Sequence, residues 1–343
     1  MKNKNKLIAL DFFCGAGGVT CGFKQSGVNV IGGIDIDHSC KETYEKNNNT
    51  KFLNVDISSL EKDSLKTFFN IKTNQDNLIF IGCSPCQYYS NINTNKTKSK
   101  KTRYLLADFQ DYVSYYNPGY IFIENVPGIE KKEGSPLLNF KKFLKKNNYY
   151  FDEAVINAKY FGIPQNRRRY VLVASRIKEI KLPKEDKKNI KTVRDAIGDS
   201  NIFYPIGTNH VDTSSFQHTT AKLSDLNIKR IKRTAHDGGD LRSWPEELKL
   251  ESRKKHTGHY DVYGRMFWDK PSPAITTKFR SLSNGRYGHP EQDRAISIRE
   301  GATLQSFPKD YKFFIESQMS MAKMIGNAVP PLLAKNICES FFN

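Results

Sequence analysis

Short apolar runs alternate with amphipathic stretches through the first half of the chain. The apolar runs have the length and the β-branched and aromatic content of strands, and they occupy residues 7–13, 28–35, 77–83, 119–125, 153–158 and 168–175. Apolar residues at helical spacing predict helices between them, at residues 20–27, 40–47, 61–69, 107–116 and 137–146. This alternation predicts an α/β fold with a doubly wound, mostly parallel sheet that binds ligands at the carboxyl ends of its strands.

The alternating pattern stops after about residue 190. Residues 191–293 are rich in Gly, His, Arg, Lys and Ser and contain few periodic runs, which predicts a second, smaller, loop-rich domain. A helical pattern resumes in residues 294–343, where Ser297 and Glu300 fit a capping box and Pro330-Pro331 fit a helix start. We therefore expect a catalytic and cofactor-binding domain at 1–190, a recognition domain at 191–293, and a return segment at 294–343 that completes the first domain.

Charge and cysteine content narrow the class of protein. The 343 residues include 54 Lys and Arg against 36 Asp and Glu, a net charge of +18 that favours a polyanionic partner, although a basic cytosolic enzyme of ordinary kind has the same composition. The six cysteines lack the density of a disulfide scaffold, which indicates a reducing cytoplasm. No apolar run approaches the roughly eighteen residues that span a membrane, so we expect no membrane association.

A glycine-rich turn follows the first predicted strand in LIALDFFCGAGGVTCGF. Gly15, Gly17 and Gly18 allow a ligand to approach the backbone near a helix N-terminus, but Thr20 stands where a dinucleotide fingerprint requires its third glycine. Asp35, at the end of the second strand, is placed to bind ribose hydroxyls. The pair indicates a nucleoside ligand without a pyrophosphate, while either feature alone is equally consistent with a structural role.

Two cysteines flank a proline in Cys83-Ser84-Pro85-Cys86, after the predicted strand at 77–83. A zinc site needs about four ligands, and the sequence offers neither a second CxxC nor a nearby pair of histidines. A thioredoxin-like redox pair normally follows the first strand of its domain, whereas this pair follows a later one. The third interpretation is a single nucleophile, Cys86, on a rigid turn at a strand end, with Cys83 as a buried bystander.

Six motifs in order resemble those of DNA (cytosine-5)-methyltransferases of the compact bacterial or phage type. They are DFFCGAGG, PCQ, ENV, QNRRR, REGATLQSFP and GNAVPP, and they extend from residue 11 to about 334. The resemblance implies a Rossmann-like, S-adenosylmethionine-dependent methyltransferase fold with a recognition domain between QNRRR and REGATLQSFP. It also implies methyl transfer to carbon 5 of a flipped cytosine in a specific short duplex DNA sequence, through a covalent adduct of Cys86 at carbon 6.

The resemblance also implies roles for individual residues. A buried Glu124 would protonate cytosine N3, Arg169 would reach cytosine O2 and Arg167 the backbone of the flipped nucleotide, although a strand-end carboxylate and an arginine cluster on phosphates are plainer alternatives. The catalytic residues implied are Cys86, Glu124, Arg167 and Arg169. The cofactor-binding residues implied are Phe12, Gly15, Gly17, Gly18, Asp35, Ile36, Asp56, Leu105, Asn327 and Ala328.

For the nucleic acid, the resemblance implies a basic loop after Cys86 and base-reading arginines in the recognition domain. The candidates for DNA contact are Gln87, Lys98, Lys100, Lys101, Arg242, Arg265, Arg280 and Arg286. We expect duplex DNA as the partner, no metal, a monomer and, in a restriction system, a cognate endonuclease. The alternatives are a cytosine-5 methyltransferase of tRNA and a DNA-binding relative without activity; a nicotinamide oxidoreductase is disfavoured by the glycine spacing.

Overall fold

The computed structural model describes residues 7–85, 104–131, 134–250 and 260–342. Its contacts divide the chain into two compact units. Unit 1 comprises Met1–Asn157, Arg168–Glu185 and Ala328–Asn343, and unit 2 comprises Ala158–Arg167 and Asp186–Asn327.

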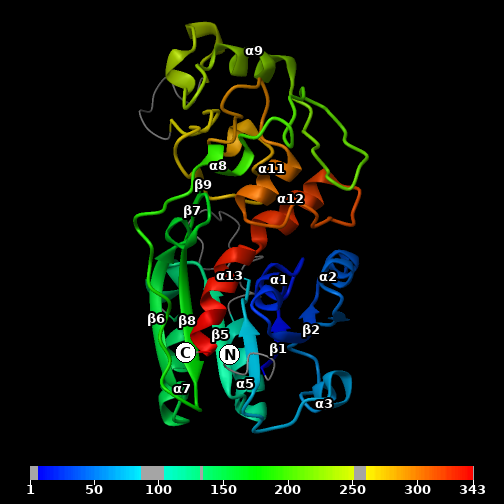
Figure 1. Ribbon diagram of the computed structural model, residues 1–343, viewed down its shortest axis with the longest axis vertical. Helices are drawn as coiled ribbons and strands as arrows, with labels where there is room; N and C mark the ends of the chain where they lie inside the picture. The colour runs from blue at the N-terminus through cyan, green and yellow to red at the C-terminus, as the bar shows by residue number, and fades with distance from the viewer. Residues whose placement is uncertain (1–6, 86–103, 132–133, 251–259, 343) are drawn as a thin grey trace. The chain divides into compact units, whose positions relative to one another are not determined.

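A seven-stranded sheet forms the centre of unit 1 (Figure 1). Its strand order is β3-β2-β1-β4-β5-β8-β6. The strands are β1 (Ile8–Phe12), β2 (Asn29–Asp35), β3 (Lys51–Asn54), β4 (Leu78–Gly82), β5 (Tyr120–Asn125), β6 (Tyr150–Asn157) and β8 (Arg168–Ser175). Neighbouring strands are parallel from β3 to β5, whereas β8 is antiparallel to both β5 and β6. The prediction of a doubly wound, mostly parallel sheet is therefore confirmed.

Helices connect the strands of unit 1 and bury apolar side chains. The helices are α1 (Gly18–Gln25), α2 (Lys41–Asn48), α3 (Ser64–Phe69), α5 (Leu105–Tyr116), α6 (Gly128–Lys131), α7 (Leu137–Lys146) and α13 (Pro331–Cys338), with short 3-10 turns η2 (His38–Cys40) and η7 (Glu339–Phe341). The largest core cluster includes Phe12, whose ring centroid lies 5.0 Å from that of Phe80 and 5.2 Å from that of Phe109. Burial of such aromatic rings supplies much of the stabilisation of a core.

Most elements agree with the hydrophobic pattern, and β3 is the main addition. All five predicted helices of the first half occur, as α1, α2, α3, α5 and α7. β3 has no local sequence signal, because its four residues, KFLN, are too short for a periodic pattern and only Phe52 is buried. Pairing with β2 makes β3 a strand, which is a tertiary effect.

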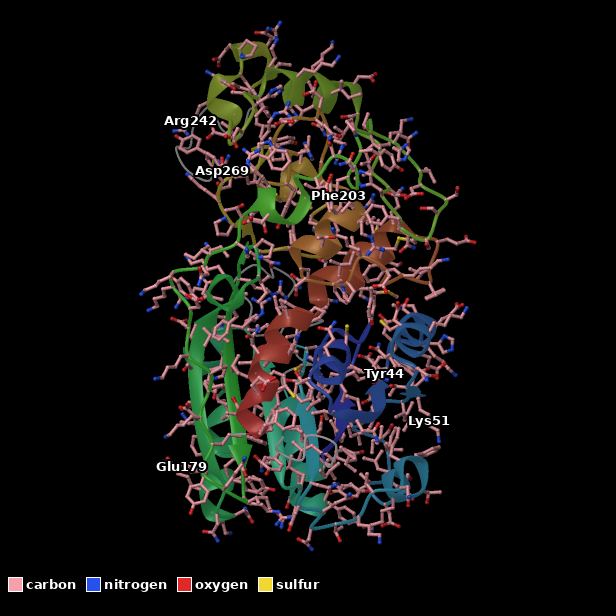
Figure 2. The ribbon with its side chains drawn as sticks, viewed as in Figure 1. Tyr44, Lys51, Glu179, Phe203, Arg242 and Asp269 are labelled. Carbon is pink, nitrogen blue, oxygen red and sulfur yellow. The ribbon has the colours of Figure 1, made fainter. Side chains whose placement is uncertain are left out.

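Unit 2 is loop-rich, as the composition predicts. Its elements are η3 (Ala158–Phe161), β7 (Gln165–Asn166), α8 (Val193–Ile197), α9 (Asp225–Arg233), η4 (Leu241–Ser243), η5 (Glu246–Leu248), β9 (Ser272–Pro273), η6 (Leu282–Asn284), α11 (Ile298–Leu304) and α12 (Gln318–Asn327). A separate small core contains Ile231, Trp244 and Tyr263. Phe203, Arg242 and Asp269 mark this unit in Figure 2.

Unit 2 is larger than the recognition domain expected at 191–293. It also contains residues 158–167 and 186–190, expected in the catalytic domain, and residues 294–327, expected in the return segment. Buried polar contacts explain the difference. The Gln165 side chain donates to the carbonyl of Leu304 at 3.1 Å and accepts from the amide of Ile275 at 2.9 Å. Such long-range contacts leave no mark on local sequence patterns.

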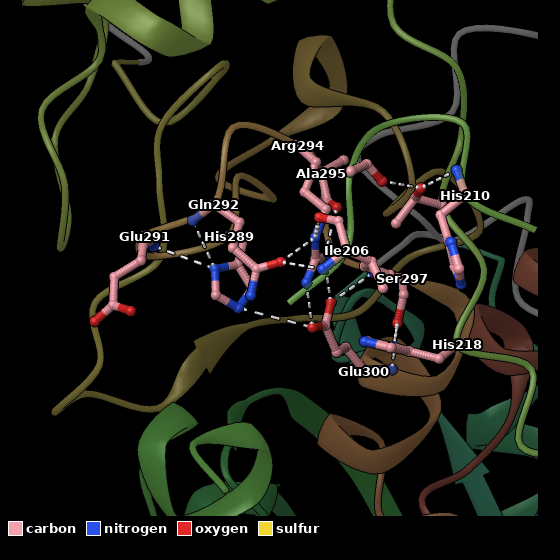
Figure 3. Close-up of polar contacts among 12 residues, drawn as sticks. Ile206, His210, His218, His289, Glu291, Gln292, Arg294, Ala295, Ser297 and Glu300 are labelled. Atoms are coloured by element: carbon pink, nitrogen blue, oxygen red, sulfur yellow. Dashed lines mark hydrogen bonds and ion pairs between the residues drawn. The ribbon is translucent and has the colours of Figure 1, made fainter. Parts of the chain in front are cut away.

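A buried ion pair organises the start of α11 (Figure 3). The Arg294 guanidinium donates two hydrogen bonds of 2.7 Å to the Glu300 carboxylate, and both side chains are buried. Ser297 caps the helix and its amide donates to Glu300, which confirms the predicted capping box. His218 reaches Ser297 Oγ at 2.9 Å, and burial lowers the pKa of the neighbouring His289 to about 4.

Gly22 allows α1 and α13 to pack closely in unit 1. A β-carbon on Gly22 would lie 2.2 Å from the carbonyl oxygen of Pro331, a backbone atom that cannot rotate away. We expect Gly22→Ala to destabilise unit 1 by about 1–3 kcal/mol through overpacking. Gly207→Ala is the control, because a β-carbon there meets no atom within 4 Å. Thermal unfolding followed by circular dichroism measures the difference, and equal midpoints for the two variants would contradict it.

Candidate active site

Four neighbouring parallel strands, β2, β1, β4 and β5, end at one edge of the unit 1 sheet. Phe12 is in register with Ile34 of β2 and with Gly82 of β4, and Ile81 of β4 is in register with Phe122 of β5. The segments that follow these strands therefore meet at the same edge. This edge carries the glycine turn after β1, the Asp35 carboxylate at the end of β2, the Cys83–Pro85 turn after β4 and the Glu124 carboxylate near the end of β5.

The glycine turn and Asp35, predicted together, are in direct contact. The amide of Gly15 donates to Asp35 Oδ2 at 2.8 Å, and the amide of Asp37 donates to Oδ1 at 2.8 Å. Gly15 and Gly17 have φ values of 49° and 85°, the left-handed region that favours glycine. A β-carbon on Gly15 would meet no atom within 4 Å, so space is open beside the turn for a ligand.

The residues that follow β2 and β3 offer both an apolar surface and a polar acceptor. The Ile36 side chain, next to Asp35, is 67% exposed. The Asn54 amide fixes this turn by donating to the carbonyls of Asp35 and Ile36, each at 3.0 Å. Asp56 is half-buried, and its Oδ1 accepts from the Ser58 amide and hydroxyl. An exposed apolar side chain between two carboxylates suits a nucleoside, whose base is flat and whose ribose and amine donate hydrogen bonds.

The other predicted cofactor residues differ in their burial and in the unit to which they belong. Gly17 and Gly18 are buried at the start of α1, and Leu105 is half-buried at the start of α5. Asn327 ends α12 in unit 2, and Ala328 begins the last segment of unit 1. Phe12 is fully buried in the aromatic core, so its burial argues against the predicted contact with the cofactor.

Asp11 is a candidate site residue outside the set expected from the sequence. It lies on β1 with 1% exposure, and its Oδ2 accepts from Thr20 Oγ1 at 2.7 Å. Its Oδ1 is buried without a hydrogen-bond partner among the residues that the structure describes. Burial raises the pKa of the Asp11 carboxyl to about 7, and the nearby Asp35 carboxylate adds to the shift. The available signal was an acid within the apolar run LIALDFF.

The Asp11 carboxyl makes a testable contribution to stability. Its pKa in the folded protein lies above the usual 3.8, so the folded state loses stability as pH rises and the buried group must ionise. We expect the free energy of unfolding of Asp11→Asn, relative to that of wild type, to rise by about 1.4 kcal/mol per pH unit between about pH 4 and 7. Denaturant unfolding across this range measures the slope. Asp111→Asn, on the exposed face of α5, serves as the control, and a flat Asp11→Asn difference would contradict the assignment.

Glu124 and Arg169 form an ion pair at the carboxyl end of β5. Because β8 is antiparallel to β5, with Glu124 in register with Val171, the first residues of β8 lie at this end. Arg169 Nε is 2.8 Å from Glu124 Oε1, and the two side chains are 17% and 10% exposed. The structure therefore brings together two of the predicted catalytic residues in a largely desolvated position.

The turn after β4 is tied to the same corner. The Asn125 amide donates to Ser84, at 3.2 Å to the carbonyl and 3.3 Å to the hydroxyl, which links the end of β5 to the cysteine turn. Burial raises the pKa of the Cys83 thiol well above its usual range, and the Glu124 and Asp11 carboxylates act in the same direction. A protonated thiol is a poor nucleophile and a poor redox partner, so Cys83 fits the bystander interpretation.

Several predicted residues fall outside the described part of the chain. They are Cys86, Gln87, Lys98, Lys100 and Lys101. Among the residues that the structure does describe, no three His, Cys, Asp or Glu side chains form a group able to hold a metal ion. No helix within the described ranges is long and apolar enough to cross a membrane.

Arg167 and Arg169 have different partners. Its side chain is 3% exposed and donates to the backbone carbonyls of Ile275 at 2.9 Å and Gly326 at 3.2 Å, all within unit 2. Burial of Arg167 among backbone carbonyls argues for a structural role and against the predicted contact with a nucleotide.

The four predicted base-reading arginines differ in exposure. Arg265 is fully buried, donating to backbone carbonyls and pairing with Asp293, which argues against a guanine contact. The Arg286 side chain is 13% exposed and donates to three backbone carbonyls. Arg280 is half-buried near Gln318. The Arg242 side chain is 69% exposed, which distinguishes it from the others.

The fold is that of the Rossmann-like, S-adenosylmethionine-dependent methyltransferases. Three features define it: the order of the strands, the single antiparallel strand β8, and the glycine turn that contacts an acidic residue at a strand end. Solved structures agree. A prophage-encoded E. coli protein assigned as a DNA modification methyltransferase superposes with a TM-score of 0.74 at 21% identity, over 98% of this chain and 99% of that one. The Entamoeba histolytica methyltransferase EhMeth superposes with a TM-score of 0.66 at 18% identity, over 98% of both chains.

Sequence comparisons identify the family. The family model for C-5 cytosine-specific DNA methylases matches residues 7–343. The Type II methylase M.HgiDII of Herpetosiphon aurantiacus is 40% identical over 96% of this chain and 94% of its own length, and the Type II methyltransferase M1.BsuMI of Bacillus subtilis is 30% identical over 94% and 78%. The chain belongs to the C-5 cytosine-specific DNA methylase family, and it is a DNA (cytosine-5)-methyltransferase.

Proposed function

We propose that this enzyme transfers a methyl group from S-adenosylmethionine to carbon 5 of a flipped cytosine in a specific short duplex DNA sequence, as the modification enzyme of a restriction-modification system. The observation that carries the proposal is the Glu124–Arg169 pair, held at the strand edge beside the turn that leads into Cys86. The names of the relatives, both of Type II, support the restriction-modification setting.

The chemistry requires carbon 5 of cytosine to become nucleophilic. The Cys86 thiolate adds to carbon 6, and a proton passed from Glu124 to N3 neutralises the charge that this addition places on the ring. The cofactor, when bound, supplies an electrophilic methyl group to carbon 5. A base then removes the proton from carbon 5, the Cys86 sulfur leaves carbon 6 as the thiolate, and N3 returns its proton to Glu124, which restores the neutral aromatic ring and the starting state of both side chains.

Glu124 and Arg169 have complementary tasks in this scheme. The guanidinium lies against Glu124 Oε1 and leaves Oε2 for the cytosine edge, and its positive charge favours both the thiolate and the developing charge at O2. Low exposure of both side chains strengthens these interactions because water screens them less.

The residues present fit the proposed cofactor. Space is open beside Gly15, whose amide is held by Asp35, and the exposed Ile36 side chain offers a flat apolar contact for the adenine. Asp35 would accept from the ribose hydroxyls and Asp56 from the adenine amine. Gly17 and Gly18 belong to the same turn after β1, and Leu105 and Ala328, both in unit 1, remain candidates for contact with the cofactor.

Methyl transfer from labelled S-adenosylmethionine to duplex DNA and, in parallel, to tRNA tests the substrate. Bisulfite sequencing then locates the modified cytosines. Label at cytosines within one short DNA motif is the expected result. Label in tRNA alone would show that the substrate is tRNA and not DNA. Label in neither would favour a DNA-binding relative without activity.

The covalent step has its own test. Fluorine at carbon 5 cannot leave as a proton does, so duplex DNA with 5-fluorocytosine in the motif should trap the adduct after methyl transfer. Mass spectrometry of the digested complex should place the nucleotide on the peptide that contains Cys86. An adduct on the Cys83 sulfur, or none in an active enzyme, would overturn the assignment of the nucleophile.

A further inference from the structure

Arg242, in unit 2, is an exposed arginine held in a fixed orientation (Figure 2). Its Nε donates to Asp240 Oδ1 at 2.9 Å and its Nη2 donates to Asp240 Oδ2 at 2.7 Å. Asp240 is anchored, because its side chain is 4% exposed, it caps η4, and Arg286 approaches it at 3.5 Å. The guanidinium also lies over the Tyr260 ring, 5.2 Å from the centroid.

This pairing leaves one edge of the guanidinium for a ligand. Asp240 takes the edge formed by Nε and Nη2, while Nη1 has no partner among the described residues. Nη1 and the outer hydrogen of Nη2 therefore form a fork of two parallel donors. Such a fork matches two neighbouring acceptors, as in the O6 and N7 atoms of guanine or two oxygens of a phosphate.

Arg242 lines a cavity. Its volume is about 370 Å³, and its lining includes Arg242, Trp244, Lys249 and Tyr260. The size falls in the range of small-molecule sites. Tyr260 is 36% exposed and offers an aromatic surface at the cavity.

The local charge favours a base over a phosphate. Asp240 neutralises much of the Arg242 charge, and Lys249, the other cation in the lining, is paired with Glu246 at 2.7 Å. Two carboxylates beside the fork weaken its attraction for a phosphate, which binds mainly through net charge. They leave the directional donors intact, and these are what an uncharged guanine edge requires.

We propose that Arg242 is a specificity-determining residue that reads one guanine of the target sequence through Nη1 and Nη2, with Asp240 as the residue that positions it. The inference rests on the proposed function. It selects one residue from the four arginines of the recognition region and adds a partner that the sequence did not indicate.

The test compares Arg242→Gln, Arg242→Lys and Asp240→Asn with wild type on a duplex library in which every position around the cytosine is randomised. Sequencing after bisulfite treatment gives the preference at each position. Arg194→Gln is the matched control, because Arg194 is also exposed, is also paired through two nitrogens with an aspartate, Asp269, and also lies over an aromatic ring, Trp268.

We expect wild type and Arg194→Gln to require guanine at one position. Both Arg242 variants should relax that position by about 5-fold to 150-fold and leave the others unchanged, and Asp240→Asn should relax the same position less. Lysine retains the charge but not the planar fork, so full specificity in both Arg242→Gln and Arg242→Lys would overturn the proposal.

Two further outcomes would also overturn the inference. If Arg242→Gln methylates all sequences more slowly and keeps the wild-type base preferences, Arg242 contacts the DNA backbone and not a base. A wild-type enzyme that methylates no duplex would overturn the proposed function and this inference with it, whereas a specific wild type with unaffected Arg242 variants overturns the inference alone. The fluorescence of the buried Trp244 shows that each variant is folded.

Discussion

Glu124→Gln is expected to reduce the methyl-transfer rate by about 10²-fold to 10⁴-fold, the usual contribution of a positioned general acid. Glutamine has nearly the same shape as glutamate and can accept a hydrogen bond from Arg169, but it has no proton to give to cytosine N3. The loss should therefore fall on the chemical step. Single-turnover rates measure this loss on unmethylated duplex DNA that contains the motif modified by wild type, with DNA and cofactor at saturation.

Glu42→Gln is the control for this variant. Glu42 also pairs with a basic side chain, Lys46 at 2.6 Å, but this pair is on the surface of α2, where both side chains are 56% exposed. We expect its rate to equal that of wild type. Cofactor affinity should be unchanged in Glu124→Gln, because Glu124 lies at the end of β5 and the proposed ribose site lies at the end of β2. A wild-type rate in Glu124→Gln would remove Glu124 from the mechanism.

Glu300→Gln is expected to destabilise unit 2 by about 3–5 kcal/mol, the cost of breaking a buried ion pair by removing one partner. Burial opposes ionisation of Glu300, but the Arg294 ion pair and hydrogen bonds hold its pKa below the usual range. Without the carboxylate, Arg294 keeps a buried charge that has lost its compensating partner. The capping interaction of α11 also weakens, because Glu300 accepts from the amide of Ser297.

Tryptophan fluorescence during denaturant unfolding reports this change directly. The chain has two tryptophans, Trp244 and Trp268, and both are buried in unit 2. Asp269→Asn is the matched control, since it breaks an aspartate–arginine pair with Arg194 that also has two hydrogen bonds but is exposed to solvent. We expect it to leave the midpoint almost unchanged. Equal midpoints for the two variants would show that burial of the Arg294–Glu300 pair adds little.

Acid pH should weaken the same network. Burial lowers the pKa of His289 to about 4 and lowers the pKa of His218, so the folded unit holds both imidazoles neutral. The stability that this provides is present above the usual pKa of about 6.5 and is lost as pH falls below it. Protonation of Glu300 removes more stability at still lower pH.

Local sequence patterns determined much of the sheet. The runs at 119–125 and 168–175 correspond to β5 and β8, because a continuous apolar run bounded by turn residues has few alternatives to a buried strand. The same patterns placed Asp35 and Glu124 at strand ends, and the parallel order of the sheet then brought these ends to one edge. β3 escaped prediction because its strand character comes from pairing with β2.

The sequence by itself determined the fold class, the family motifs and the carboxylates at the strand ends, since each depends on residues close together in the chain. Only the tertiary structure decided which arginine meets which partner. Arg169 pairs with Glu124 because β8 runs antiparallel to β5, Arg167 and Arg265 are buried among backbone carbonyls, and Arg242 remains exposed on Asp240. An arginine has the same charge and donors in every setting, so long-range packing alone separates a guanidinium paired with a strand-end carboxylate from one buried among carbonyls and from one exposed to solvent.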